Sequence, residues 1–108
     1  MTDFSYLNVD NAYKLISQKV TKTPLVTNDY INNLLEAEIY FKLENLQNTG
    51  SFKLRGATHK ITKLIETVKD SGVVAYSSGN HAQAVAYASM INSISATVSY
   101  THLTLPTM

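Results

Sequence analysis

One short apolar run constrains the fold of this chain more than any other feature. The residues Val-Val-Ala-Tyr at positions 73–76 lie between turn-forming residues at 71–72 and 77–80. A continuous apolar run of this length is typical of a strand in a buried parallel sheet. Parallel strands need a crossover connection, which is usually a helix. The run therefore predicts an α/β protein.

The rest of the chain supplies the other elements of this class. Helical spacing of apolar residues predicts helices at residues 9–19, capped by Asn8, and at residues 52–69, with a short helix near 29–35 and an alanine-rich one at 82–91. Alternation predicts a half-buried strand at residues 39–43, and a further strand begins near Ile94. This order of helices and strands indicates βαβ units with crossover helices.

Composition narrows the classes of function. Nine Lys and Arg against eight Asp and Glu leave a net charge of +1, which argues against a nucleic-acid or membrane-binding role. The absence of cysteine excludes a disulfide scaffold and suits the cytoplasm, where we expect the protein. No apolar run is long enough to span a bilayer, and His59, His81 and His102 are too far apart for a local metal motif. We therefore expect no metal.

The first junction that could carry chemistry is the segment of residues 48–56, which leads from the predicted strand into the long helix. Lys53 and Arg55 lie in the first turn of that helix, where the helix dipole disfavours cations. Local rules are often broken at functional sites, and a lysine there is a candidate amine nucleophile. The alternative is a solvated lysine on an exposed turn.

The second junction, residues 77–83, leads from the apolar strand into the alanine-rich helix. Ser77, Ser78 and Gly79, together with the backbone N–H groups of a helix start, can bind a carboxylate or phosphate. Plain capping of the helix by Ser or Asn is the alternative and needs no ligand.

Together these segments resemble the serine/threonine dehydratase family of fold-type-II pyridoxal-phosphate enzymes, which includes threonine ammonia-lyase and serine racemase. The resemblance covers residues 21–97 and rests on four blocks in the family's order: Thr23-Pro24-Leu25, and residues 41–47, 49–57 and 77–83. It implies the N-terminal part of the tryptophan synthase β-like fold, with an incomplete parallel sheet. It also implies that pyridoxal 5'-phosphate is the cofactor.

The resemblance also implies a role for each site residue. Lys53 matches the lysine that binds the cofactor covalently and removes the Cα proton, and Phe52 matches the aromatic side chain beside the pyridine ring. Asn80 matches the residue that hydrogen-bonds the phenolic oxygen of the cofactor. Ser77, Asn80 and His81 match the loop that holds the substrate carboxylate.

The function that this resemblance implies is loss of the β-hydroxyl of L-threonine or L-serine as water, followed by hydrolysis of the resulting enamine to a 2-oxo acid and ammonia. Ser78 departs from many dehydratases, which have Ala there, whereas serine racemases have a Ser that exchanges a proton on the opposite face of the substrate. Racemase or hydroxyaspartate dehydratase activity therefore stays open. A non-catalytic module that binds an anion is the alternative from another class.

Family members are longer, have two domains and are expected to form homo-oligomers. We expect residues 1–70 to begin the cofactor-binding large domain and residues 71–97 to begin the smaller one. Residues 98–107 match the translation of a transposase sequencing adapter, which predicts a non-native tail at 98–108; a divergent strand and loop is the alternative. The family's phosphate-binding loop lies downstream, so we expect the chain alone to be inactive.

Overall fold

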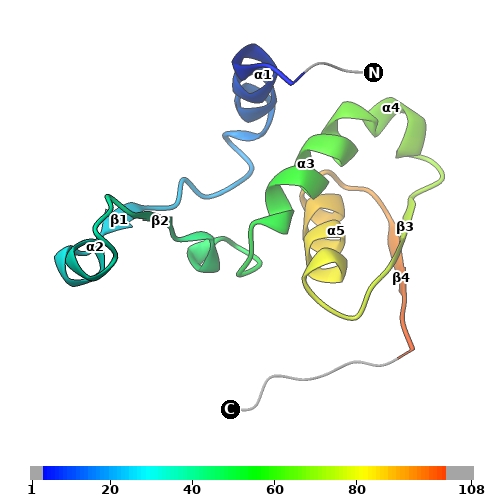
Figure 1. Cartoon of the computed structure of the whole chain (residues 1–108). Coiled ribbons are helices and arrows are strands. Elements are labelled where there is room, and N and C mark those ends of the chain that lie inside the picture. The colour runs from blue at the N-terminus through cyan, green and yellow to red at the C-terminus, as the bar shows by residue number, and fades with distance from the viewer. Residues whose placement is uncertain (1–3, 102–108) are drawn as a thin grey trace.

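The computed structural model describes residues 4–101 and contains the predicted α/β arrangement (Figure 1). Helices α3 and α5 pack against each other at its centre, and α1 contacts α3. The elements are α1 (Tyr6–Ile16), β1 (Leu25–Thr27), α2 (Asp29–Leu35), β2 (Tyr40–Lys42), the 3₁₀ turn η1 (Glu44–Leu46), α3 (Lys53–Lys63), α4 (Ile65–Val68), β3 (Val73–Tyr76), α5 (Asn80–Ile91) and β4 (Ala96–Ser99).

The core consists of small and aliphatic side chains where α3 and α5 meet. Leu54 on α3 and both Ala84 and Ala88 on α5 are fully buried. Short alanine side chains let two helix backbones approach closely, so the larger Leu54 can fill the space between them. The other buried apolar residues are Ile16, Val20, Ile61, Ala75, Val85 and Ile94.

The predicted parallel pairing is confirmed for β3 and β4, with α5 as the crossover between them. The register pairs Val73 with Ala96 and Tyr76 with Ser99. The expectation that the whole β3 run is buried is wrong, because Val74 and Tyr76 remain exposed. The described part of this sheet has two strands. Ala75 of β3 is buried in the core, and Val73 is partly buried against it.

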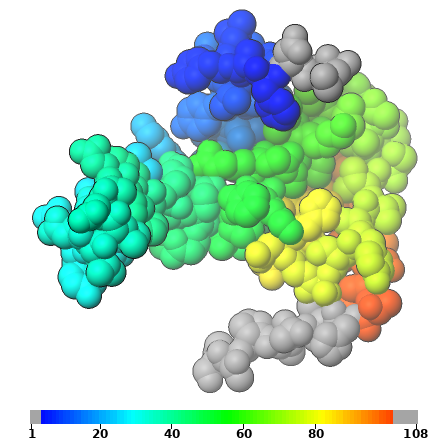
Figure 2. All heavy atoms as spheres, viewed as in Figure 1, coloured from blue at the N-terminus to red at the C-terminus, as the bar shows by residue number. Residues whose placement is uncertain are grey.

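The strand predicted at residues 39–43 forms as β2 over Tyr40–Lys42 and is exposed there, while the flanking Ile39 and Leu43 are partly buried. It pairs in antiparallel fashion with β1, a strand that we did not predict, and every residue of both strands is exposed. The two-stranded β1–β2 ribbon and α2 project from the packed helices (Figure 1 and Figure 2). Phe41, the apolar residue at the centre of β2, therefore remains exposed.

The observed bounds of two helices differ from the predicted ones. The first begins at Tyr6 rather than at residue 9, because the Ser5 hydroxyl caps it by accepting a hydrogen bond from the backbone N–H of Asn8 at 3.1 Å. The helix predicted at residues 52–69 is broken at Leu64, whose backbone is not helical. The break turns the chain so that Ile65 and Val68 pack against the core while Leu64 stays partly exposed.

The last predicted strand lies within the described residues, whereas the predicted non-native tail lies only partly within them. The last strand begins at Ala96, and Ile94 is buried in the turn before it. Val98 and Ser99 belong to β4, whereas residues 102–108 of the predicted tail lie outside the described residues. Between residues 4 and 101, no helix has the length and apolar character needed to cross a bilayer.

Gly72 provides a test of the turn that leads into β3. Its φ is +80°, and an added Cβ would lie 2.6 Å from the backbone oxygen of Ser95, which accepts a hydrogen bond from Val73. We expect Gly72→Ala to lower the free energy of unfolding by more than about 1 kcal/mol in a urea titration. Gly56→Ala is the matched control, because its Cβ meets nothing within 4 Å and helix propensity predicts a gain of up to about 1 kcal/mol. Equal stability of Gly72→Ala and the wild type would contradict the described turn.

Candidate active site

The first junction places Lys53 at the first position of α3. The chain turns at Gly50, which has a φ of +77° and donates its N–H to the Gln47 carbonyl oxygen at 2.8 Å. The buried Ser51 then accepts a hydrogen bond from the Lys53 backbone N–H at 3.4 Å. A tight turn followed by a serine contact thus begins the helix at this residue.

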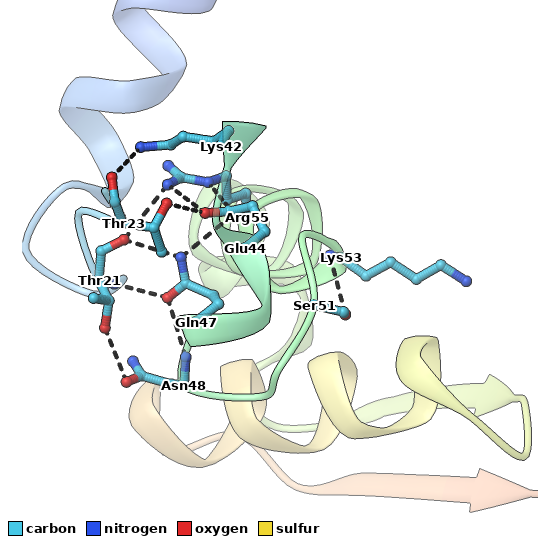
Figure 3. Close-up of polar contacts among 9 residues, drawn as sticks. All are labelled: Thr21, Thr23, Lys42, Glu44, Gln47, Asn48, Ser51, Lys53 and Arg55. Carbon is cyan, nitrogen blue, oxygen red and sulfur yellow. Dashed lines mark hydrogen bonds and ion pairs between the residues drawn. The ribbon is translucent and has the colours of Figure 1, made fainter. Parts of the chain in front are cut away.

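The Lys53 side chain is exposed and extends away from the polar contacts on the other side of the helix start (Figure 3). No hydrogen bond or ion pair between described residues involves its amine. An amine that no other described residue holds is accessible to a carbonyl group, and covalent catalysis by lysine requires such access.

The second junction leaves the start of α5 without a side-chain cap. The Ser77 hydroxyl accepts a hydrogen bond from the Gly79 N–H at 3.1 Å, and Gly79, the residue before the helix, has no side chain to offer. Ser78, Asn80 and His81 are exposed around this turn. The capping alternative is therefore not what the structure shows, and the first N–H groups of α5 are open to an anion.

The two junctions open onto the same concave surface, which we call the Lys53 hollow. Its volume is about 740 Å³. Of the predicted site residues, Phe52, Lys53 and His81 line it, whereas Ser77, Ser78 and Asn80 lie in the adjoining turn and helix start. Its other lining residues are Gly56, Ala57, Lys60, Ile61, Leu64, Val68, Gly72, Val73, Val74 and Val85. A reactive amine and an anion-binding helix start thus share one largely apolar surface.

The sequence analysis missed a polar cluster on the opposite side of the α3 start, and we call it the Glu44 cluster (Figure 3). Arg55 donates from Nε to Glu44 Oε1 at 2.5 Å and from Nη2 to Glu44 Oε2 at 3.1 Å. The signal was present in the sequence, because a first-turn arginine with no acid in that turn needs an anion from elsewhere. The members of the cluster are Thr21, Thr23, Glu44, Gln47 and Arg55.

The cluster connects three segments of the chain. The Thr23 hydroxyl donates to Glu44 Oε2, and the Gln47 side chain makes two hydrogen bonds to the backbone of Thr21, at 2.8 and 2.9 Å. Arg55 also donates to the Thr21 carbonyl oxygen at 3.4 Å. The segment of residues 21–23, the turn η1 and the first turn of α3 are therefore joined by one network.

The network also changes the acidity of Glu44. The hydrogen bond from Arg55 lowers the pKa of the Glu44 carboxyl from 4.5 to about 2; burial opposes this shift, and hydrogen bonds from Thr23 and Gln47 add to it. Glu44 therefore stays ionised at any ordinary pH. Among the described residues, no group of three or more His, Cys, Asp or Glu side chains is placed to hold a metal ion.

Comparisons with known proteins show which family of sequences the chain resembles. A family profile described as "Pyridoxal-phosphate dependent enzyme" matches residues 16–107. The chain is 47% identical over 94 residues to a serine racemase of Dictyostelium discoideum and 51% identical over 90 residues to a biosynthetic L-threonine dehydratase of Lactococcus lactis. It is 44% identical over 94 residues to an L-threo-3-hydroxyaspartate ammonia-lyase of Saccharomyces cerevisiae. These matches cover 87%, 83% and 87% of this chain, in the same order.

Solved structures show the same fold. The serine racemase of Dictyostelium discoideum superposes with a TM-score of 0.82 at 47% identity, over 87% of this chain and 31% of that one. A threonine deaminase of Solanum lycopersicum gives a TM-score of 0.73 at 29% identity, over 92% of this chain and 29% of that one. The chain spans only 29%, 22% and 29% of the three relatives that it matches by sequence.

The Glu44 cluster predicts a specific pH dependence of stability. Because the pKa of Glu44 is lower in the folded state than its usual value of 4.5, its stabilising effect is fully present above about pH 4.5 and is lost as the pH falls toward about 2. Between pH 4.5 and about 2, we expect the free energy of unfolding to fall less in Glu44→Gln than in the wild type. Urea titrations at several pH values measure this difference. Glu66→Gln is the control, since Glu66 pairs with Lys69 at the surface with 81% of its side chain exposed. An unchanged pH slope in Glu44→Gln would contradict the cluster.

Proposed function

Because the chain belongs to the family of pyridoxal-phosphate dependent enzymes, we propose that the protein that carries it is an ammonia-lyase acting on L-threonine or L-serine. The observation that carries this proposal is the unpaired Lys53 amine in the same hollow as the uncapped start of α5. A relative named threonine dehydratase, 51% identical, supports it. The chain spans less than a third of its relatives, so the activity is proposed for a polypeptide of their length, which we call the full-length protein.

The residues present fit the cofactor of the family. Lys53 offers a primary amine without an internal partner, and Phe52 is an exposed aromatic side chain next to it on the rim of the hollow. Asn80, the first residue of α5, has an exposed amide side chain that can donate a hydrogen bond to the phenolic oxygen of the cofactor. We therefore assign Lys53, Phe52 and Asn80 to cofactor binding.

The start of α5 is suited to the substrate carboxylate. Open N–H groups at a helix N-terminus and the positive end of its dipole both favour an anion. Ser77, Asn80 and His81 surround this position and can add side-chain hydrogen bonds. We propose that these three residues orient the amino acid so that its Cα faces the Lys53 amine.

The chain's own part in the chemistry is proton transfer and orientation. Pyridoxal phosphate, when bound, withdraws electrons from the substrate Cα and so makes its proton acidic. The Lys53 amine moves that proton, and the α5 start holds the carboxylate while the β-hydroxyl leaves.

A racemase is the second candidate, and Ser78 is the observation that favours it. Its side chain lies in the exposed turn directly before α5, and a hydroxyl there can return a proton to the substrate from a different side than Lys53. Relatives named serine racemase and hydroxyaspartate ammonia-lyase match about as well as the dehydratase. Racemisation and hydroxyaspartate dehydration are thus proposed alternatives within the same family.

The remaining expectations stay predictions. We propose that the full-length protein is a cytoplasmic homo-oligomer that takes a small amino acid and binds neither nucleic acid nor membrane. The division at residue 70, the non-native tail and the inactivity of the isolated 108 residues also stay predictions. A non-catalytic anion-binding module differs from the proposed enzyme in one respect, which is that it would not bind a cofactor at Lys53.

Replacing Lys53 tests the proposal directly. In the full-length protein, Lys53→Ala removes both the covalent attachment of the cofactor and the base at Cα. We expect it to abolish the visible absorbance band of the bound cofactor and to lower the kcat for L-threonine at least about 10²–10⁴-fold. Lys53→Arg is expected to fail equally, because a guanidinium stays protonated.

Lys63→Ala is the matched control, since Lys63 is an exposed lysine in the last turn of the same helix and does not line the hollow. It should keep the absorbance band and the turnover of the wild type. Retention of the band in Lys53→Ala would overturn the assignment of the lysine.

Ser78 separates elimination from racemisation. In the full-length protein, Ser78→Ala is expected to leave formation of the 2-oxo acid from L-serine largely intact and to remove formation of D-serine. The two products can be followed in the same reaction by a coupled 2-oxo acid assay and by chiral chromatography. If both activities fell together, Ser78 would belong to the carboxylate site instead.

A further inference from the structure

The first turn of α3 carries two cations that point in different directions. Lys53 and Arg55 are two positions apart, which places them about 200° apart around a helix with 3.6 residues per turn. Arg55 therefore lies on the side of the Glu44 cluster, and Lys53 extends from the opposite side of the turn (Figure 3). A rotation of this turn about its axis would move both side chains together.

Apart from the fully buried side chain of Leu54, few contacts hold this turn in its rotation. Phe52, the residue before the helix, gives no side-chain cap, and the Ser51 contact to the Lys53 N–H is long at 3.4 Å. Arg55, in contrast, makes two hydrogen bonds to Glu44 and a third to the Thr21 carbonyl oxygen. A bidentate pair between a guanidinium and a carboxylate has a fixed planar geometry, so it can set the orientation of the backbone that carries it.

The Glu44–Arg55 pair also differs from the surface pairs of the chain. The side chains of Glu44 and Arg55 are 13% and 26% exposed, and the two residues are 11 positions apart. The pairs Lys14–Asp10 and Lys69–Glu66 are local to one helical segment and far more exposed. A pair that is shielded from water and joins separate segments contributes to geometry, whereas an exposed local pair contributes little.

We propose that Glu44 is a positioning residue for Lys53: by holding Arg55, it fixes the rotation of the first α3 turn so that the Lys53 amine projects into the hollow. Thr23 and Gln47 hold the Glu44 carboxylate in turn, so its position is set before any ligand binds. Glu44 also neutralises one of the two cations at the positive end of the helix dipole, which stabilises this start of the helix. The inference rests on the proposed role of Lys53.

The test uses the full-length protein and the variants Glu44→Ala, Glu44→Gln, Arg55→Ala and the double variant Glu44→Ala/Arg55→Ala. The first readout is the rate at which apoprotein mixed with pyridoxal phosphate gains the visible band of covalently bound cofactor. The second is hydrogen exchange of the Lys53 and Leu54 amides in the apoprotein. The third is the effect on kcat and on KM for L-threonine. Circular dichroism at the assay temperature shows that each variant is folded.

We expect Glu44→Ala and Arg55→Ala each to slow covalent attachment of the cofactor to Lys53 about 10–100-fold. Misplacement of a reacting group by about 1 Å lowers a reaction rate by up to about 100-fold. The kcat should fall with little change in KM, and exchange should be faster at the start of α3. Glu44→Gln keeps one hydrogen bond to Arg55 and should lose less. The double variant should be no slower than either single one, because the two residues act as a unit.

Glu66→Ala is the matched control, because it removes an exposed ion pair outside the site. It should leave all three readouts unchanged. Attachment at the wild-type rate in folded Glu44→Ala would overturn the positioning role while leaving the role of Lys53 intact. If the wild type itself gained no band, the proposed function would fail, and with it the inference that rests on it.

Discussion

The packing of α3 against α5 is the interaction on which the rest of the described structure depends. Leu54 on α3 is fully buried in the same core cluster as Ala88 on α5, and Ala84 on α5 is also fully buried. Each of these helices follows directly on one of the two chemically distinctive junctions of the chain. The close contact of the helices therefore brings an amine and an anion-binding helix start to one concave surface, although the two are separated by more than twenty residues in the sequence.

The second constraint is electrostatic and acts on the same helix. Two cations in the first turn of α3 oppose the helix dipole, and the Glu44 cluster compensates one of them, while the Lys53 amine has no partner among residues 4–101. The asymmetry separates the roles of the two residues: Arg55 is part of the internal structure, and Lys53 faces the hollow. Lys53, whose charge the helix dipole disfavours, thus lies near Arg55, whose charge Glu44 compensates. Such local violations of a folding rule are common at functional sites.

The sequence was informative where a local pattern had a single structural solution. The apolar run at β3, its parallel partner and the starts of α3 and α5 follow from turn residues and periodicity, and so does the exposed helix near residue 29. Three features could not be predicted in this way. The cap at Ser5 depends on one hydrogen bond, the break at Leu64 depends on where the core lies, and the exposure of the β1–β2 ribbon depends on what packs against it.

For the candidate site, the sequence predicts the residues that belong to motifs but not the ion pair beside them. Lys53, Phe52 and His81 could be chosen from their motifs, and the structure places them around one hollow. Glu44 lies in the matched block of residues 41–47, but the sequence does not predict it as a site residue. Its partner is eleven residues later, and an ion pair produces no periodic pattern. The sequence shows that the helix dipole disfavours Arg55 in this turn, but not which of the eight acidic residues pairs with it.

The central claim is that Lys53 is the lysine that binds the cofactor, and the sharpest measurement is chemical. Lys60 lines the same hollow and is the rival amine. The full-length protein is incubated with pyridoxal phosphate, the bond is fixed by borohydride reduction, and the modified peptide is identified by mass spectrometry. The account predicts modification of Lys53 and not of Lys60. Modification of Lys60 alone, or of no lysine in residues 4–101, would contradict it.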